Sequence, residues 1–253
     1  MSKKPAPASD AAPSSPLQKF INANTSYHTR PSETRIVISA RNERQKQYLR
    51  SLHNNDVTIG YGAPGTGKTF LPAVTALDDL VNERKRKIVI IRPSVEVDGE
   101  NDIGALPGDI LGKYGPQVKP VTDTLVKYLG LNKLTQLLMN EVIEIVPIAF
   151  IRGRSFDHTW VLFDEAQNAS KSAMKAVLTR KGENCKIAIS GDIKQSDRDS
   201  NNGLEDLLHR LEVRPLPQFG LVEFTKHDIE RDKDSPIIKD VLDLYDMWIP
   251  PIL

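Results

Sequence analysis

The sequence lacks the features of a secreted or membrane-inserted chain. Its 253 residues include one cysteine, Cys185, so no internal disulfide can form, and this suits a reducing compartment. No apolar run approaches the roughly 20 residues that a membrane-spanning helix needs. The N-terminal stretch MSKKPAPASD has no hydrophobic signal segment. We therefore expect a cytoplasmic protein without a membrane partner, and a buried, inert thiol at Cys185 in the apolar run CKIAIS.

Net charge is also nearly absent. The 34 Lys and Arg residues against 33 Asp and Glu residues leave a formal charge of +1. Global charge therefore does not indicate nucleic-acid binding, which would require a local patch. The length and the 39% of hydrophobic residues suffice for one sizeable core. Composition alone leaves the function open.

The order of sequence patterns predicts an α/β domain. Residues 1–35 hold five of the seventeen prolines and little apolar content, which is typical of a disordered tail. Over 36–253, apolar β-branched runs alternate with helical patterns, as in a mainly parallel sheet with helices on both faces. Residues 98–120, with five glycines and three prolines, are expected to form a long loop. The expected strands are 56–61, 87–92, 142–146, 159–163, 186–190 and 220–224, and the expected helices include 68–83, 171–181, 204–211 and 235–247.

The segment GAPGTGKT, from Gly62 to Thr69, matches the phosphate-binding pattern GxxxxGK[ST] in full. It follows a strand pattern and precedes a helical one, as the mechanism requires. Its glycines let backbone N–H groups point at phosphate oxygens, Lys68 supplies a positive charge, and the Thr69 hydroxyl reaches Mg²⁺. A glycine-rich turn without a ligand is the alternative. The expected ATP-binding residues are Gly62, Ala63, Pro64, Gly65, Thr66, Gly67, Lys68, Thr69 and Phe70.

Pro72 lies five residues past Gly67, where the following helix needs its N–H groups. We expect a slight kink or an early first turn at this position.

Two acids, Asp164 and Glu165, directly follow the expected strand 159–163. A carboxylate in that place is typical of a Walker B site, so we expect Asp164 to hold Mg²⁺ and Glu165 to orient and deprotonate the attacking water. The alternative is an exposed acidic turn. Ligands of open parallel sheets bind along the carboxyl edge of the strands. The groups expected on that edge are Lys68, Arg92, Asp164 and the segment 192–195.

Taken in order, GAPGTGKT, IRPSVEV, LPGD, RGRSF, LFDEAQN and GDIKQSD resemble the motifs of the PhoH-like ATPases. That family is related to the P-loop core of superfamily 1 helicases. The resemblance covers about residues 41–245 and implies one RecA-like P-loop NTPase domain that binds ATP and Mg²⁺. It also implies that Asn42 and Gln45 read the adenine edge, which an amide can do by donating and accepting at once. Gln195 resembles the residue that senses the γ-phosphate.

Arg231 falls where the family carries an arginine in a D-x-x-R pattern, so the resemblance implies an arginine finger that stabilises charge on the transferred phosphoryl group. The family usually has His-Pro shortly afterwards, whereas Asp232 and Lys233 follow here. Two interpretations stay open: a finger, or a surface residue salt-bridged to the acids around it.

A motor needs two such domains or neighbouring subunits, and this chain has room for one. The resemblance accordingly suggests a homo-oligomer, a hexameric ring, in which an arginine supplied in trans couples neighbours. Basic side chains can follow the phosphates of RNA or single-stranded DNA while aromatic rings stack on bases. A nucleotide-site or interface role is the alternative for RGRSF. The candidate nucleic-acid residues are Arg152, Arg154, Phe156, Lys113, Tyr114 and Lys119.

Two functions remain open. One is ATP hydrolysis coupled to remodelling or unwinding of RNA or single-stranded DNA. The other is an ATP-dependent switch or assembly module. The intact Glu165 favours hydrolysis, because a switch needs no efficient base.

Overall fold

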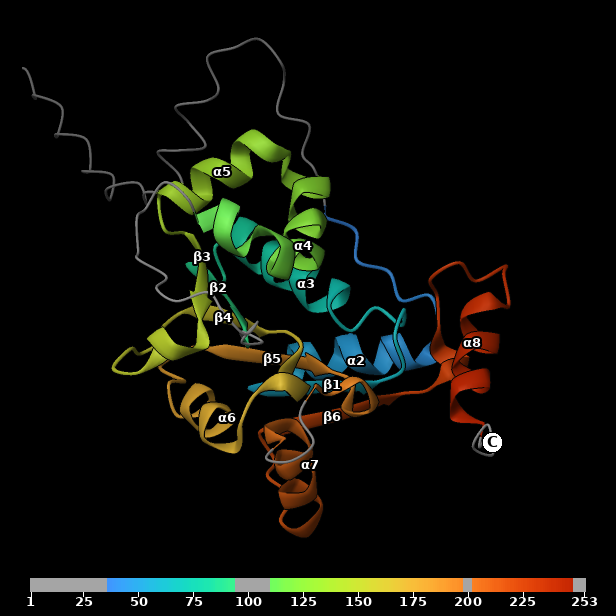
Figure 1. Ribbon diagram of the computed structural model, residues 1–253. Helices are drawn as coiled ribbons and strands as arrows, with labels where there is room; N and C mark the ends of the chain where they lie inside the picture. Colours follow the sequence, from blue (N-terminus) through green and yellow to red (C-terminus); the bar gives the residue numbers. More distant parts are fainter. Residues whose placement is uncertain (1–35, 94–109, 198–201, 248–253) are drawn as a thin grey trace, which may run out of the picture. The chain divides into compact units, whose positions relative to one another are not determined.

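Six strands form one sheet in the order β3-β2-β4-β5-β1-β6 (Figure 1). All of its pairings are parallel. Each strand end lies within one residue of the sequence-based expectation, so the predicted parallel α/β architecture is confirmed. The strands are β1 (Val57–Gly62), β2 (Lys87–Arg92), β3 (Ile143–Pro147), β4 (Thr159–Phe163), β5 (Lys186–Gly191) and β6 (Phe219–Phe224).

The computed structural model describes residues 36–93, 110–197 and 202–247, without the side chains of 110–117. The expected tail over residues 1–35 lies outside these ranges. No helix in the described ranges is both long enough and apolar enough to cross a membrane.

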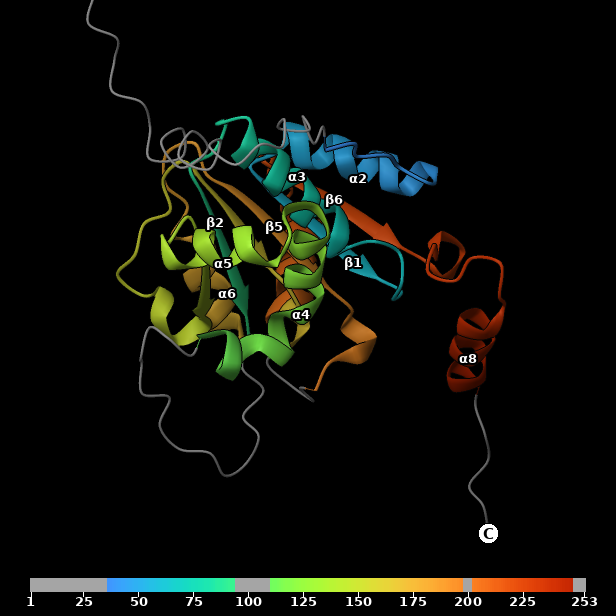
Figure 2. The same ribbon diagram turned by 90° about the horizontal axis from the view of Figure 1, so that it is seen from above.

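Helices cover both faces of the sheet (Figures 1 and 2). One face carries α2 (Glu43–Asn54), α3 (Phe70–Val81), α4 (Ile110–Leu129) and α5 (Leu131–Met139). The other face carries α6 (Lys171–Leu178) and α7 (Gly203–Val213), and α8 (Ile237–Asp246) follows β6. Short 3₁₀ turns are η1 (Ile148–Ile151), η2 (Ala166–Asn168), η3 (Ile193–Gln195) and η4 (Lys226–Asp228).

The expectation of a loop throughout residues 98–120 is wrong for its second half, where α4 begins at Ile110 and continues past Pro120. Residues 98–109 lie outside the described ranges. Packing explains the difference: Val118, Val121 and Leu125 recur at helical spacing and are all buried. Burial of this apolar face against α3 and the sheet outweighs the helix-breaking tendency of the glycines and prolines.

Pro72 lies in the first turn of α3, so the expected early first turn is confirmed. A non-proline residue here would donate its N–H to the carbonyl of Lys68. That carbonyl instead accepts a hydrogen bond from the buried Tyr48 hydroxyl at 3.2 Å. The phenol of α2 thus takes over the donor that proline lacks.

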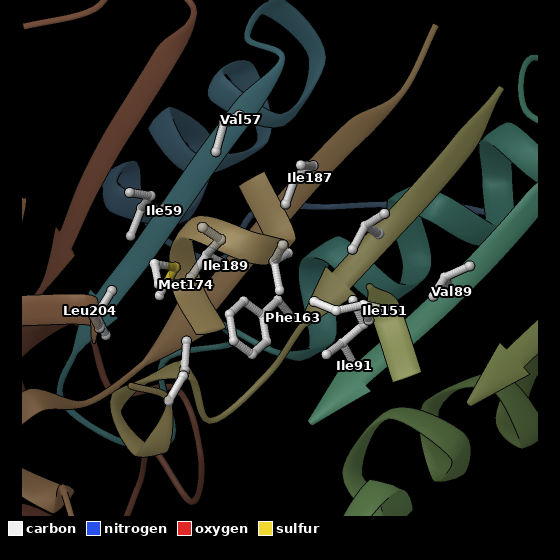
Figure 3. Close-up of a cluster of buried hydrophobic side chains, with 14 of the residues drawn as sticks. Val57, Ile59, Val89, Ile91, Ile151, Phe163, Met174, Ile187, Ile189 and Leu204 are labelled. Carbon is white, nitrogen blue, oxygen red and sulfur yellow. The ribbon is translucent and has the colours of Figure 1, made fainter. Parts of the chain in front are cut away.

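Alternating strand residues build the core on the face that α6 and α7 cover (Figure 3). Ile59 of β1, Phe163 of β4 and Ile189 of β5 meet Met174 of α6 and Leu204 of α7 there. Each such side chain contributes about 1.5–3 kcal/mol through its burial. This rigid layer holds the carboxyl ends of β1, β4 and β5 in fixed positions.

Cys185 belongs to the same core, and burial raises the pKa of its thiol to about 11. The expected burial of this cysteine is confirmed.

Candidate active site

A cavity of about 540 Å³ opens at the carboxyl edge of the sheet. Its walls come from the phosphate-binding loop, the ends of β4 and β5, and α4. The segment that leads into α2, the start of α2 and residues 230–231 complete them. Of the groups expected on this edge, Lys68, Asp164, Asp192 and Gln195 line the cavity. Arg92 stands behind Glu165, which is itself in the wall.

The loop glycines occupy backbone conformations that other residues rarely adopt. Gly62, Gly65 and Gly67 have φ values of 106°, 72° and 94°. A Cβ on Gly62 would lie 2.1 Å from the carbonyl oxygen of Phe224, which accepts the N–H of Ala63 at 2.8 Å. The glycine pattern is therefore required by geometry as well as by phosphate chemistry.

Lys68 lies folded over its own loop. Its Nζ donates to the carbonyl of Gly62 at 2.6 Å and also to that of Ala63. Burial lowers the pKa of this amine to about 8, although the nearby carboxylates, Asp192 foremost, oppose the shift. An anion in the cavity would offer the ammonium better partners than these carbonyls.

Asp164 directly follows β4 and is buried, and within the described residues only one of its two carboxylate oxygens accepts hydrogen bonds. Its Oδ1 accepts from Ser190 Oγ at 2.6 Å and from Thr69 Oγ1 at 2.8 Å. Its Oδ2 is buried without a hydrogen-bond partner in the described part of the chain. Burial raises the pKa of this carboxyl, while the two hydroxyl donors oppose the rise.

The orphaned Oδ2 and the Thr69 hydroxyl form an oxygen donor pair that fits Mg²⁺. The described residues contain no cluster of three or more His, Cys, Asp or Glu side chains of metal-binding geometry. That suits Mg²⁺, which is commonly held by one or two carboxylates together with waters and substrate phosphates.

Glu165 adopts a left-handed backbone conformation, with φ 52° and ψ 39°. Such a conformation costs a non-glycine residue roughly 1–2 kcal/mol. Its two carboxylate oxygens are both engaged: Arg92 lies 2.9 Å from Oε1, and Gln167 Nε2 donates to Oε2 at 2.6 Å. The candidate base is therefore held in one place by its neighbours.

Gln167 was not expected from the sequence to act in the site. It is buried, and its Oε1 accepts the N–H of Asp192 at 3.1 Å while its Nε2 holds Glu165. One amide thus links the ends of β4 and β5. The sequence does place an amide two residues after Glu165, in DEAQN. The spacing alone did not show that the Gln167 side chain points toward Glu165.

Gln195 ends η3, is exposed and lines the cavity. Arg231 reaches the same cavity from the segment after η4, because the N–H groups of Glu230 and Arg231 both donate to the carbonyl of Gly65 at 3.0 Å. Arg231 is exposed, and within the described residues its guanidinium forms no ion pair with the acids around it. Arg231 lies beside the phosphate-binding loop of its own chain.

The expected adenine-reading pair separates in the structure. Gln45 lines the cavity, but its Nε2 donates to the carbonyl of Thr66 and its Oε1 accepts from Arg41 N–H, both at 2.9 Å. Asn42 caps α2 and donates to Asp228 and Glu230 instead. Other groups on this side of the cavity are Ser39, Arg41, Phe70 and Lys127.

The nucleic-acid candidates also divide. Phe156 is 2% exposed, so the expected base stacking by this ring is wrong. Arg154 pairs with Glu144 at 2.6 Å and covers the Phe156 ring, which is a structural role. Arg152 and Lys119 are exposed. The side chains of Lys113 and Tyr114 lie outside the described residues.

Comparisons with known proteins identify relatives of this chain. The family model described as PhoH-like protein matches residues 37–246. Protein PhoH of Escherichia coli (strain K12) is 39% identical over 206 residues, which cover 80% of this chain and 57% of that one. A PhoH-like protein of Bacillus subtilis (strain 168) is 36% identical over 204 residues, 80% and 62% of the two chains. The chain thus spans somewhat more than half the length of these relatives.

Among solved structures, the HK97 bacteriophage large terminase aligns with a TM-score of 0.48 at 14% identity. The alignment covers 78% of this chain and 41% of the terminase.

Proposed function

We propose that this chain, which belongs to the PhoH-like family, is a Mg²⁺-dependent ATPase. We propose further that it remodels or unwinds RNA or single-stranded DNA. One observation carries the proposal: a single cavity gathers the Lys68 ammonium, the orphaned oxygen of Asp164 and the Glu165 carboxylate. Those are the groups that phosphoryl transfer to water needs, namely a phosphate clamp, a metal ligand and a base.

The chain's own residues would divide the work as follows. The loop N–H groups and Lys68 bind the β- and γ-phosphates. Thr69 and Asp164 would hold Mg²⁺, which when bound neutralises phosphate charge. Gln195 contacts the γ-phosphate from the β5 side. Arg231, anchored to Gly65 of the same chain, is assigned to the transferred phosphoryl group in cis.

Arg92 and Gln167 each contact one oxygen of Glu165 and so fix the orientation of the carboxylate. Each oxygen keeps a second lone-pair site that can accept from the attacking water. Hydrolysis is therefore expected to depend on where these two partners hold the carboxylate. An orientation that points it away from the water would favour the second candidate, an ATP-dependent switch or assembly module in which binding is frequent and hydrolysis rare.

A homo-oligomer, with a hexameric ring as the form that the resemblance suggests, belongs to the proposal. The apolar stripe of α8 supports it. Ile237, Val241, Leu244 and Tyr245 follow one another at helical spacing and are between 41% and 85% exposed. Exposed stripes of this kind mark association surfaces. We assign a second copy of the chain as the occupant.

The test compares ATP binding and ATP turnover with and without single-stranded RNA or DNA at low salt. Glu165→Gln is expected to retain binding and to lose turnover, because the amide cannot take a proton. Glu212→Gln, an isosteric change on the exposed surface of α7, is the matched control and should behave as wild type.

Stimulation of turnover by a strand, weakening as salt rises, would support the coupled ATPase. Normal turnover by Glu165→Gln would refute the role of Glu165. Unstimulated turnover together with an ATP-dependent change of mass in solution would move the conclusion to the switch.

A further inference from the structure

A second cavity, of about 300 Å³, is lined mainly by residues of α6. Figure 1 shows α6 on the face of the sheet opposite α3. Its walls carry three cationic side chains and two hydroxyls, and no acidic residue. The lining residues are Arg152, Ser172, Lys175, Ala176, Thr179 and Arg180.

The three cations stand without counter-charges. Cations around them are paired, Arg154 with Glu144 and Lys181 with Asp56. In the described part of the chain, by contrast, Arg152, Lys175 and Arg180 form no ion pair, and the Nε of Arg180 is buried without a hydrogen-bond partner. A buried donor without a partner is costly, and an anion beside Arg180 would relieve that cost.

Helix electrostatics account for only part of this arrangement. Cations near the C-terminus of α6 suit the helix dipole, which explains Lys175 and Arg180. The dipole explains neither Arg152, which follows η1, nor the burial of an unsatisfied Arg180 Nε. Arg and Lys side chains and the Ser172 hydroxyl are groups that donate to phosphate oxygens, whereas the Thr179 hydroxyl donates to the carbonyls of Lys175 and Ala176.

We propose that the α6 cationic surface (Arg152, Lys175 and Arg180, with Ser172 and Thr179) binds the backbone phosphates of a single-stranded nucleic acid. The inference rests on the proposed function and names the docking surface for its strand. Ser172, Lys175 and Thr179 follow one stripe of the helix, and the stripe extends over roughly 10 Å at 1.5 Å per residue. That length exceeds one phosphate group and suits a chain of them.

The α6 cationic surface is expected to contact the phosphates of the strand and not its bases. No aromatic side chain lines the cavity, and the nearby Phe156 is buried in the core. Binding is therefore expected to be independent of base sequence and strongly dependent on salt. The surface is also linked to the ATP site, because α6 follows η2, and the η2 residue Gln167 holds Glu165. A strand bound along α6 would accordingly act on the element that holds the base.

The test is fluorescence anisotropy of a labelled oligouridylate or oligothymidylate bound to the full chain over a salt series. The variant is Arg152→Gln with Lys175→Gln, since both side chains are exposed and unpaired and their loss should not disturb folding. The control with the same change of charge is Arg50→Gln with Lys133→Gln, on α2 and α5 across the sheet. Thermal unfolding and ATPase rate without a strand should match wild type in both variants.

Each lost phosphate contact lowers the slope of log affinity against log salt by about 0.7 for single strands. The α6 double variant should therefore lose about 1.4 from its slope. Wild type would then lose about sevenfold more affinity than the variant between about 50 and 200 mM salt. The control should keep the wild-type slope, and stimulation of the ATPase should fall in the α6 variant alone.

The other outcomes overturn the inference in distinguishable ways. Equal losses in both double variants would mean that overall charge matters and this surface does not. Wild-type binding and stimulation in the α6 variant would remove the surface and leave the proposed function intact. Displacement of the strand by inorganic phosphate at equal phosphate concentration would indicate a site for a lone anion. A wild-type chain that binds no strand at low salt would overturn the surface and the nucleic-acid coupling together.

Discussion

Replacing Gln45 by alanine distinguishes two roles of its amide, one in the structure of the phosphate-binding loop and one in adenine recognition. In the structure Gln45 is buried, and it joins the carbonyl of Thr66 to the N–H of Arg41. It therefore braces the phosphate-binding loop from α2. The resemblance to the PhoH-like ATPases implies that the same amide reads adenine. Both of its polar atoms already have backbone partners, so base reading would have to use the second amide proton and the second oxygen lone pair.

The cost of the substitution follows from burial. Thr66 is fully buried, so its carbonyl loses its Gln45 partner where water cannot replace it, which costs about 1–3 kcal/mol. Arg41 is exposed, so water can replace the lost acceptor there at little cost. Gln45→Ala should therefore lower the free energy of unfolding without nucleotide by about 2 kcal/mol. Urea unfolding followed by circular dichroism measures this change.

The nucleotide preference then identifies the role. A brace acts on the loop that holds the phosphates, so affinities for ATP and GTP should fall by the same factor. Gln47→Ala, the same truncation at an exposed position of α2, is the control, with a stability change within about 0.5 kcal/mol. Wild-type stability in Gln45→Ala, together with weaker binding of ATP alone, would refute the brace and restore the adenine-reading role.

Three further predictions concern the same cavity. Burial lowers the pKa of Lys68 to about 8, and bound phosphates favour its charged form, so ATP binding above pH 8 should be accompanied by uptake of a proton. Calorimetry should find that the affinity for ATP falls about tenfold from pH 7 to pH 9. Binding at pH 9 without proton uptake would contradict this prediction. Gly62→Ala should lower the free energy of unfolding in urea titrations much more than Gly130→Ala. Both glycines have positive φ, but only a Cβ at position 62 would clash with a carbonyl oxygen. Equal losses of stability in the two variants would argue against the clash. Arg92→Ala should free Glu165 and raise ATP turnover without a strand about fivefold, as expected for the loss of an ion pair of about 1 kcal/mol; a fall in turnover would mean that Arg92 positions the base instead of restraining it.

The sheet was predictable because most of its strands are short apolar, β-branched runs. β2 and β4 have the expected bounds, and the other four strands differ from the expected ranges by one residue at one or both ends. The phosphate-binding loop was predictable for a related reason. Its glycines are required by local backbone geometry, which sequence records directly.

The misassigned segments were those in which tertiary packing outweighs local preference. The glycines and prolines around Pro120 predict a loop, yet Val118 and Leu125 bury one face of α4. Phe156 sits between basic residues in RGRSF, which resembles a base-stacking site. Its backbone instead pairs with the chain at Lys181, and this turns the ring into the core. In irregular segments no periodicity tells which side chains face inward.

The partners of Glu165 could not be predicted from spacing, but they follow from strand order. β2 lies beside β4, with Ile91 opposite Phe163, so Arg92 and Glu165 meet at the sheet edge although they are distant in sequence. β5 flanks β4 on its other side and brings Asp192 within reach of Gln167. The candidate base is thus held through contacts with the ends of both neighbouring strands.

This arrangement gives the two proposals one physical connection. Arg92 and Gln167 fix the orientation of the Glu165 carboxylate, and its left-handed backbone gives it little freedom to turn away. Of these two partners, Gln167 belongs to η2, which leads directly into α6. A strand held along α6 can therefore change the orientation of the candidate base by shifting one amide, without reaching the cavity.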